Sequence, residues 1–348
     1  MKRNRAFIWV LVGAGLALVV LLLAVSSVAA GHPSPRLVVH DSPGLLAETA
    51  GAPTFYSSGW EPINQGQTLT FSHNLGLPPE EYAVELWFWD ADGGRGINRY
   101  GYGGVEADDK LYGAYWQNLT ANTIEVYRQP DDTAADQIRI NVWVPPAAPG
   151  YDSLWKDISK DQTLTFNHNL GITATELTVV LWFSGTRGIH HYAYGGLVIG
   201  TPPELQGAYW RNLTNTSVQV TRQRDDTYVE QVRVFVAQAA TPDYDSGWQD
   251  IAPGAELTYT HRLNWDPNML LVRGECYDPT PGGLGIHQVY AGGNHDSTVG
   301  WQGTNLQNLT RNTVRVVRQA NDSVCPQSRV IITKRRIQTY LPLVLRNS

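Results

Sequence analysis

The sequence predicts an all-β protein of three tandem antiparallel β-sandwich domains that follow an N-terminal signal or anchor segment. Three observations lead to this fold class. Apolar and polar residues alternate with a period of two, as at Leu69, Phe71 and His73, whose side chains share one strand face. Turns rich in Gly, Pro, Asn and Asp separate these short segments, and no stretch after residue 30 has the periodicity of an amphipathic helix. One unit of about ninety residues also occurs three times.

Residues 1–30 have the organisation of an export signal. The basic start MKRNR precedes the uninterrupted apolar run 6–25, and small residues at 28–30 offer a cleavage site. The apolar run is also long enough to span a bilayer, so an uncleaved signal anchor is the alternative to a cleaved signal peptide. In either case we expect a secreted protein or one at the extracellular cell surface, with 31–55 as a linker and membrane contact only through an uncleaved segment.

The three repeats are predicted over 56–144, 151–237 and 244–333, with a C-terminal tail over 334–348. Each repeat opens on a Tyr-x-Ser-x-Trp motif and continues with a Leu-Thr-aromatic segment that ends in His. Each then reaches an Asn-Leu-Thr triplet and an Arg-Gln pair. Units of this length exceed solenoid repeats, so each is expected to have its own hydrophobic core.

The composition argues against nucleic acid as a partner. Lys and Arg number 26 against 32 Asp and Glu, which gives a formal net charge of −6, so the basic footprint that a phosphate backbone requires is missing. The two cysteines, Cys276 and Cys325, are too few for a disulfide scaffold. In an oxidising compartment they can pair with each other, although their spacing does not establish that the two sulfurs meet.

Arginine and acidic residues recur in each repeat at the end of a strand. Such groups suit the paired hydroxyls of a sugar, and tyrosines in the Gly-rich segments offer ring faces for stacking. A structural alternative stays open, in which each arginine pairs with a turn aspartate and the tyrosines pack in the core. The candidate ligand-binding residues are Arg128, Asp131, Asp132, Arg222, Asp225, Asp226, Arg318, Asp322, Tyr102 and Tyr194.

No constellation in the sequence indicates catalysis, a cofactor or a metal. The equivalent histidines His73, His168 and His261 lie on apolar strand faces, where a backbone hydrogen bond inside each domain is favoured over a shared metal site. Neighbouring acids such as Asp131 and Asp132 share one turn, whereas glycoside hydrolysis needs carboxylates on opposite sides of a bond. The chain is therefore predicted to be a non-enzyme without a cofactor.

The order of landmarks in each repeat resembles the H-type lectin domain. The resemblance rests on the Ser-Gly-Trp opening, the Leu-x-Phe strand, and the Asn-x-Thr turn that precedes a strand. It implies a small β-sandwich that binds N-acetylgalactosamine and related sugars through the loop joining its last two strands, with a homotrimer as the usual assembly. For this chain it implies glycans or cell-surface polysaccharide as partners, and either a homo-oligomer or an intrachain pseudo-trimer.

The function expected from the sequence is that of an exported, non-catalytic carbohydrate-binding, lectin-like or adhesion protein with three tandem binding modules. Linking three weak sites would raise the affinity for one ligand surface. The alternative is a structural cell-surface protein whose sandwich domains are spacers or assembly contacts.

Overall fold

The computed structural model describes residues 54–107, 109–144, 150–200, 203–296 and 300–335. Within these ranges the chain is all-β, and its only helices are the 3-10 turns η1 (Pro79–Glu81), η2 (Ala174–Glu176) and η3 (Pro267–Met269). None of the helices found there has the length and apolar character needed to cross a membrane. The predicted signal or anchor segment, most of the linker and most of the tail lie outside the described residues.

Each repeat contributes ten strands in the same order. The first repeat forms β1 (Phe55–Ser57), β2 (Glu61–Pro62), β3 (Thr68–Ser72), β4 (Ala83–Asp90), β5 (Gly96–Asn98), β6 (Val105–Ala107), β7 (Lys110–Tyr112), β8 (Ala114–Gln117), β9 (Thr123–Arg128) and β10 (Gln137–Trp143). The second forms β11 (Tyr151–Asp152), β12 (Lys156–Asp157), β13 (Thr163–Asn167), β14 (Leu177–Gly185), β15 (Gly188–His190), β16 (Leu197–Ile199), β17 (Glu204–Gln206), β18 (Ala208–Arg211), β19 (Ser217–Arg222) and β20 (Gln231–Gln238). The third forms β21 (Tyr244–Asp245), β22 (Gln249–Asp250), β23 (Glu256–Thr260), β24 (Leu270–Asp278), β25 (Gly285–His287), β26 (Asn294–Asp296), β27 (Gly300–Gln302), β28 (Thr304–Gln307), β29 (Thr313–Arg318) and β30 (Gln327–Lys334).

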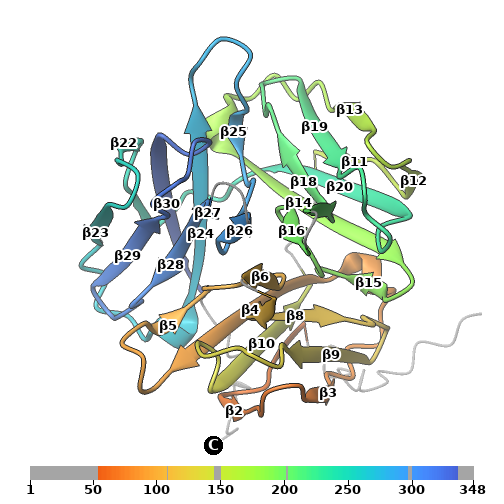
Figure 1. Ribbon diagram of the computed structural model, residues 1–348. Coiled ribbons are helices and arrows are strands. Elements are labelled where there is room, and N and C mark those ends of the chain that lie inside the picture. The colour runs from red at the N-terminus through yellow and green to blue at the C-terminus, as the bar shows by residue number, and fades with distance from the viewer. Residues whose placement is uncertain (1–53, 108, 145–149, 201–202, 297–299, 336–348) are drawn as a thin grey trace, which may run out of the picture. The chain divides into compact units, whose positions relative to one another are not determined.

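The strands are arranged as a six-bladed β-propeller, so the prediction of three tandem β-sandwich domains is wrong (Figure 1). Each repeat supplies one five-stranded sheet, such as β1-β10-β4-β5 with β2, and one three-stranded sheet, such as β3-β9-β8. Three repeats therefore give six blades. Each repeat also forms a two-stranded ribbon, and the strands β6, β16 and β26 of these ribbons contact one another at the middle of the ring.

Main-chain hydrogen bonds join the blades of one repeat to those of the next. Where β8 meets β15, the Asn118 N–H donates to the Arg187 carbonyl and the His191 N–H donates to the Trp116 carbonyl, each at 3.0 Å. Strand β18 meets β25 and strand β28 meets β5 in the same way, so the third repeat returns to the first. A sheet edge that is paired in this way is no longer free, which is why the repeats do not close as separate sandwiches.

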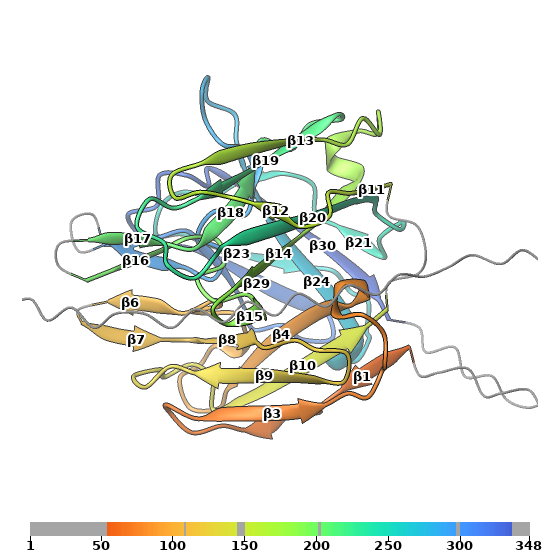
Figure 2. The same ribbon diagram turned by 90° about the vertical axis from the view of Figure 1, so that its right-hand side faces the viewer.

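The hydrophobic clusters also mix residues of neighbouring repeats. Trp182 of the second repeat is buried in the core of the first, and Ile286 of the third is buried in the core of the second. Trp87 and Ile97 of the first repeat complete the core of the third. Each repeat thus supplies part of its neighbour's core around the whole ring. Figure 2 shows the ribbons β6–β7 and β16–β17 projecting to the same side of this ring.

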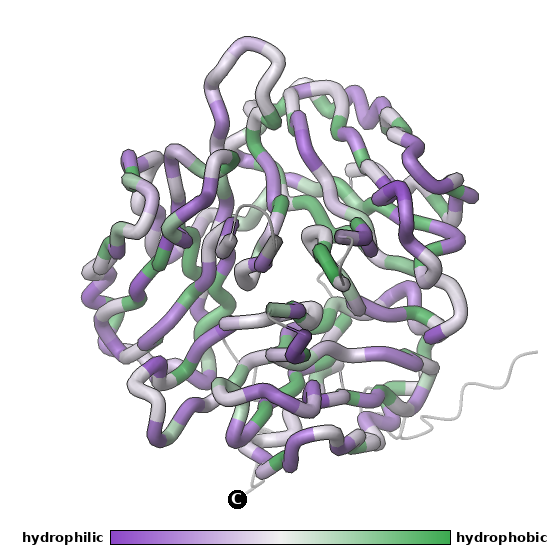
Figure 3. Tube along the Cα trace, viewed as in Figure 1, coloured by the Kyte–Doolittle hydropathy of each residue, from purple (hydrophilic) through white to green (hydrophobic). Residues whose placement is uncertain are grey.

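The predicted period of two is present in the strands. In β9 the side chains of Ile124, Val126 and Arg128 are buried, and those between them are half-buried. Figure 3 shows hydrophilic and hydrophobic residues alternating along many strands. Strand β4 departs from this pattern with four consecutive buried residues at 85–88, because one of its faces covers its own core and the other meets the neighbouring repeat.

Candidate functional site

The candidate arginines and the last aspartate of each turn form buried ion pairs inside the blades. In the first repeat Arg128 Nε donates to Asp132 Oδ2 at 2.8 Å. Arg128 Nη1 donates to the Ile63 carbonyl at 2.7 Å, and Nη2 donates to the Asp132 carbonyl at 2.9 Å. The equivalent pairs in the other two repeats are Arg222–Asp226 and Arg318–Asp322. These side chains are the structural pairs that the sequence left open as an alternative.

The paired aspartates also hold their own turns. Asp132 Oδ1 accepts from the Gly113 N–H at 2.7 Å, and Oδ2 accepts from the Ala135 N–H at 2.9 Å in addition to the arginine. Asp131 lies beside this pair and accepts from the Leu111 N–H at 2.9 Å. In the second repeat Asp225 accepts from the Leu205 N–H, a bond that lowers the pKa of the Asp225 carboxyl. The structure thus uses these groups to hold main chain, and sugar binding at these turns stays a prediction.

The two candidate tyrosines lie where successive repeats meet. The Tyr102 hydroxyl is 2.7 Å from His191 Nδ1 and accepts from Trp116 Nε1 at 3.1 Å. The Tyr194 hydroxyl donates to Gln288 Oε1 at 2.6 Å. Burial raises the pKa of Tyr102 to about 12 and raises that of Tyr194 further. Both hydroxyls are therefore neutral hydrogen-bonding groups at physiological pH.

The equivalent histidines at the strand ends lie apart from one another, one in each repeat. His73 Nδ1 accepts from the Leu75 N–H at 3.4 Å, and His168 and His261 make the same local contact. Burial lowers the pKa of all three imidazoles. Over the residues that the structure describes, no group of three or more His, Cys, Asp or Glu side chains is placed to hold a metal ion.

The two cysteines form a disulfide in the third repeat. Cys276 of β24 is bonded to Cys325 in the turn before β30, with 5.1 Å between their Cα atoms. The Cys325 N–H also donates to Asp322 Oδ2 at 2.9 Å, so the disulfide adjoins the buried Arg318–Asp322 pair.

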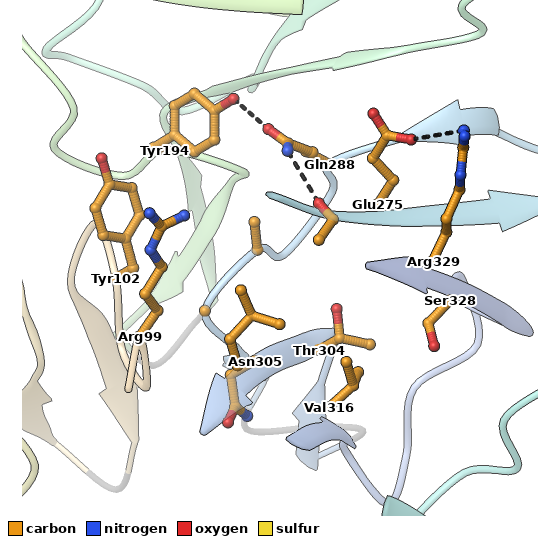
Figure 4. A pocket seen from close by; sticks show the side chains of 14 residues that line it. Arg99, Tyr102, Tyr194, Glu275, Gln288, Thr304, Asn305, Val316, Ser328 and Arg329 are labelled. Atoms are coloured by element: carbon orange, nitrogen blue, oxygen red, sulfur yellow. Dashed lines mark hydrogen bonds and ion pairs between the residues drawn. The ribbon is translucent and has the colours of Figure 1, made fainter. Parts of the chain in front are cut away.

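A cavity of about 80 Å³ lies in the third repeat against the first and second repeats (Figure 4). Strands β24, β28, β29 and β30 supply most of its wall, and Arg99, Tyr102 and Tyr194 reach it from the other two repeats. On this measure one water molecule needs about 10–15 Å³, so the cavity has room for roughly five to eight waters. Within the part of the chain that the structure describes, we take this cavity as the candidate ligand site.

The cavity exists because the third repeat has a glycine where the others have leucine. Gly274 of β24 occupies the strand position of Leu86 in β4 and Leu181 in β14. Both leucines are fully buried in the cores of their repeats. The missing Gly274 side chain leaves Leu306 as its nearest neighbour, at ordinary contact distance from where a Cβ would lie. The glycine at this one strand position therefore opens a cavity in the third repeat.

A second difference enlarges the same space. Ala291 bridges to Thr304, as Tyr102 of the first repeat bridges to Ala114, so a methyl group takes the place of a phenol ring. On the adjacent strand Leu306 takes the position of Trp116. The ring pair that fills the junction of the first two repeats is thus reduced to small aliphatic groups in the third.

Polar side chains line the wall that these changes expose. Gln288 Nε2 donates to the Gly274 carbonyl at 3.1 Å, and its Oε1 accepts from the Tyr194 hydroxyl. Glu275 lies 3.7 Å from Arg329, as the dashed line in Figure 4 marks. Burial raises the pKa of Glu275, an effect that Arg273 and Arg329 oppose.

Arg99 brings a further cation to the cavity from the first repeat. Its Nη2 donates to Glu85 Oε1 at 2.9 Å, and its guanidinium lies 4.1 Å from the centre of the Trp87 ring. Arg99 Nε is buried without a hydrogen-bond partner. The cavity therefore combines neutral donors and acceptors with fixed charges, as sites for small polar ligands do.

Of the candidate residues named from the sequence, Tyr102 and Tyr194 line this cavity. Reasoning from repeated motifs missed the rest of its wall, because the cavity depends on where the third repeat differs from the others. Gly274 belongs to no recurring motif, whereas Ala291 directly precedes the Gly-Gly pair that recurs in each repeat. A comparison of equivalent positions in the three repeats would have revealed the cavity, because Gly274 stands in place of Leu and Ala291 in place of Tyr. For Gly274 that comparison needs the strand register, which the structure supplies. For Ala291 the recurring Gly-Gly pair that follows it already aligns the three repeats.

Comparisons of the chain with protein-family models, with curated proteins and with solved structures find no match.

Proposed function

We propose that the protein is a non-catalytic binding protein for a small hydroxylated molecule of the carbohydrate class, held in the cavity of the third repeat. The observation that carries the proposal is the replacement of a core leucine by Gly274 next to a polar wall. A cavity made only by loss of packing costs stability, whereas one lined with hydrogen-bonding groups suits a polar ligand.

The wall supports this ligand class by its chemistry. Gln288, Thr304 and Ser328 offer neutral donors and acceptors, which match the hydroxyl groups of a sugar or polyol. Tyr102 and Tyr194 add aromatic surface for the apolar side of such a ligand. The volume favours a monosaccharide or a smaller polyol over an oligosaccharide chain.

The proposal places one site in each chain instead of three. The changes that open the cavity belong to the third repeat, and the first two repeats carry leucine and tyrosine at the same positions. Adhesion through three linked modules is therefore not part of it. Export to the cell surface stays a prediction from the N-terminal segment.

The test is calorimetric titration of the full-length chain with a panel of monosaccharides and polyols, compared with Gly274→Leu. The substitution gives the third repeat the residue that the others carry, and we expect it to abolish binding in a folded protein. Ile138→Val shortens a buried core side chain of the first repeat that does not line the cavity, and it should leave the affinity unchanged.

The outcome that favours a structural role is also clear. If no sugar or polyol binds and Gly274→Leu only raises the free energy of unfolding, by about 1 kcal/mol as cavity-filling changes do, the binding proposal is wrong. In that case the propeller serves as a spacer or as an assembly contact.

A further inference from the structure

An arginine recurs near the start of the last strand of each repeat. In two of the repeats an aspartate forms an ion pair with it. In the second repeat Arg233 Nε donates to Asp152 Oδ1 at 3.0 Å and Nη2 donates to Oδ2 at 2.6 Å. In the third repeat Arg329 makes the same two bonds to Asp245, at 2.8 and 2.5 Å. This is the planar, bidentate pairing of a guanidinium with a carboxylate.

The first repeat has the arginine but not the carboxylate. Arg139 occupies the same place in the sheet, and Ser57 stands where the other repeats have Asp152 and Asp245. Arg139 is 1% exposed, and its Nε and Nη2 atoms have no hydrogen-bond partner. These are the two atoms that the aspartate occupies in the other repeats. An unpaired buried donor of this kind is costly to leave unsatisfied.

The charged groups around Arg139 carry a net positive charge, which favours the binding of an anion. Arg99 and Arg335 lie near it, and the acids facing this group are Glu85 and Asp266. Three cations against two acids leave one positive charge without a counterpart. Burial lowers the pKa of Arg139 to about 10, which still leaves the side chain protonated at neutral pH.

The remaining contacts of Arg139 hold its guanidinium in place. Its Nη1 donates to Asn268 Oδ1 of the third repeat. The ring of Trp60 lies 4.8 Å from its guanidinium carbon, and Trp60 Nε1 donates to the same Asn268 oxygen at 3.0 Å. The donor pair is therefore pre-oriented without a ligand, which reduces the entropy that binding must overcome.

We propose that the first repeat binds a small carboxylate from solution at Arg139, with its two oxygens on Nε and Nη2, in place of the aspartate that the other repeats supply. In the other repeats this place adjoins solvent, since the side chains of Asp152 and Asp245 are 25% and 34% exposed, and Ser57 is exposed as well. Arg139 itself is covered, so the carboxylate reaches Nε and Nη2 only by displacing the side chains that lie over them. The bound carboxylate supplies the missing negative charge where the first repeat meets the third. This site is separate from the cavity and independent of the proposed function.

The test uses acetate as the probe and the full-length chain. Thermal unfolding and calorimetric titration are followed with sodium acetate, against sodium chloride at equal ionic strength. We expect saturable binding of acetate and a higher melting temperature.

Ser57→Asp should weaken acetate binding about tenfold or more, because an internal carboxylate occupies both donors. The same variant should have a higher melting temperature than the wild type in the absence of acetate. Ser57→Ala keeps the donors free and should bind acetate as the wild type does.

Two results overturn the proposal. One is a wild-type chain that shows no saturable response to acetate beyond that to chloride, which means that water or another part of the chain satisfies Arg139. The other is a folded Ser57→Asp variant, checked by its near-ultraviolet circular dichroism, that binds acetate as tightly as the wild type. Neither result bears on sugar binding in the cavity.

Discussion

Single buried side chains set much of this protein's response to its surroundings. His191 is the clearest case, because it lies between two repeats and is hydrogen-bonded at both ring nitrogens. Its Nε2–H donates to the Leu181 carbonyl at 2.8 Å, so Nδ1 is the atom that accepts from the Tyr102 hydroxyl. The bonding therefore requires the neutral imidazole.

Burial of this neutral ring predicts acid sensitivity. Burial lowers the pKa of His191 to about 3, against about 6.5 in an unfolded chain. Between these values the unfolded state binds a proton that the folded state does not. The free energy of unfolding should therefore fall as the pH drops below about 6.5, by up to about 1.4 kcal/mol per pH unit for this group, and level off near pH 3.

His191→Gln tests this, because Gln288 fills the equivalent place in the third repeat. Urea unfolding at pH 7 and pH 5 should show a smaller loss of stability in the variant than in the wild type. His190 and His287, whose pKa values burial lowers to about 4, remain in both proteins and supply part of the residual slope. The rest comes from His73, His168 and His261, whose pKa values burial also lowers. Equal pH dependence in the two proteins would show that His191 titrates normally.

At this scale the sequence can suggest a contact where both partners lie close together in the chain. The Arg128–Asp132 pair spans four residues of one turn, so its formation could be weighed from the sequence alone. The partner of His191 is Tyr102, which lies in another repeat, and no local pattern indicates that contact. The lack of a carboxylate partner for Arg139 is equally remote, since it depends on Ser57, more than eighty residues earlier in the chain.

At the scale of elements, the third repeat replaces packing by a covalent bond. Cys276 occupies the strand position of Phe183, since both pair with the histidine of the following strand. Cys325 corresponds to Val229, because each N–H donates to the buried aspartate of its turn. The disulfide thus takes the place of two buried side chains, Phe183 and Val229, in the core of the second repeat, and it ties down β24, the strand that carries Gly274.

Removal of the disulfide should therefore destabilise the chain. The cysteines are 49 residues apart, and closing a loop of that length stabilises a protein by about 4 kcal/mol in the chain-entropy description. We expect Cys276→Ala with Cys325→Ala to lower the free energy of unfolding by about 2–4 kcal/mol in denaturant titrations. A reducing agent should shift the wild type toward the variant and leave the variant itself unchanged. A wild type that is insensitive to reduction would contradict this prediction.

The strands themselves were largely predictable, and their partners were not. The alternation at Leu69 and Phe71 predicts a strand, and β3 runs over Thr68–Ser72. The same alternation cannot say that β8 pairs with a strand of the next repeat, because an edge strand and a central strand share one side-chain period. The sandwich prediction failed at this step.

For the whole molecule, ring closure decides how the repeats behave. The third repeat returns to the first through the Arg99 N–H, which donates to the Leu306 carbonyl at 2.9 Å, and the Asn308 N–H, which donates to the Arg95 carbonyl at 2.8 Å. A sequence period reveals copies of a unit but not the contacts between them. Trp182, Ile286 and Ile97, which each complete a neighbour's core, carry no mark of that role in the sequence.

Closure predicts that residues 54–335 unfold as one cooperative unit, because removing one repeat exposes sheet edges and core surface of the other two. Asp226→Asn tests this within the second repeat. It weakens a buried ion pair, which should cost about 3 kcal/mol or more, and in differential scanning calorimetry it should move one single transition to lower temperature. Glu230→Gln removes an exposed charge from the same repeat and should change stability by less than about 0.5 kcal/mol. If the repeats were independent domains, Asp226→Asn would instead split off an early transition that holds about a third of the unfolding enthalpy and leave the rest in place.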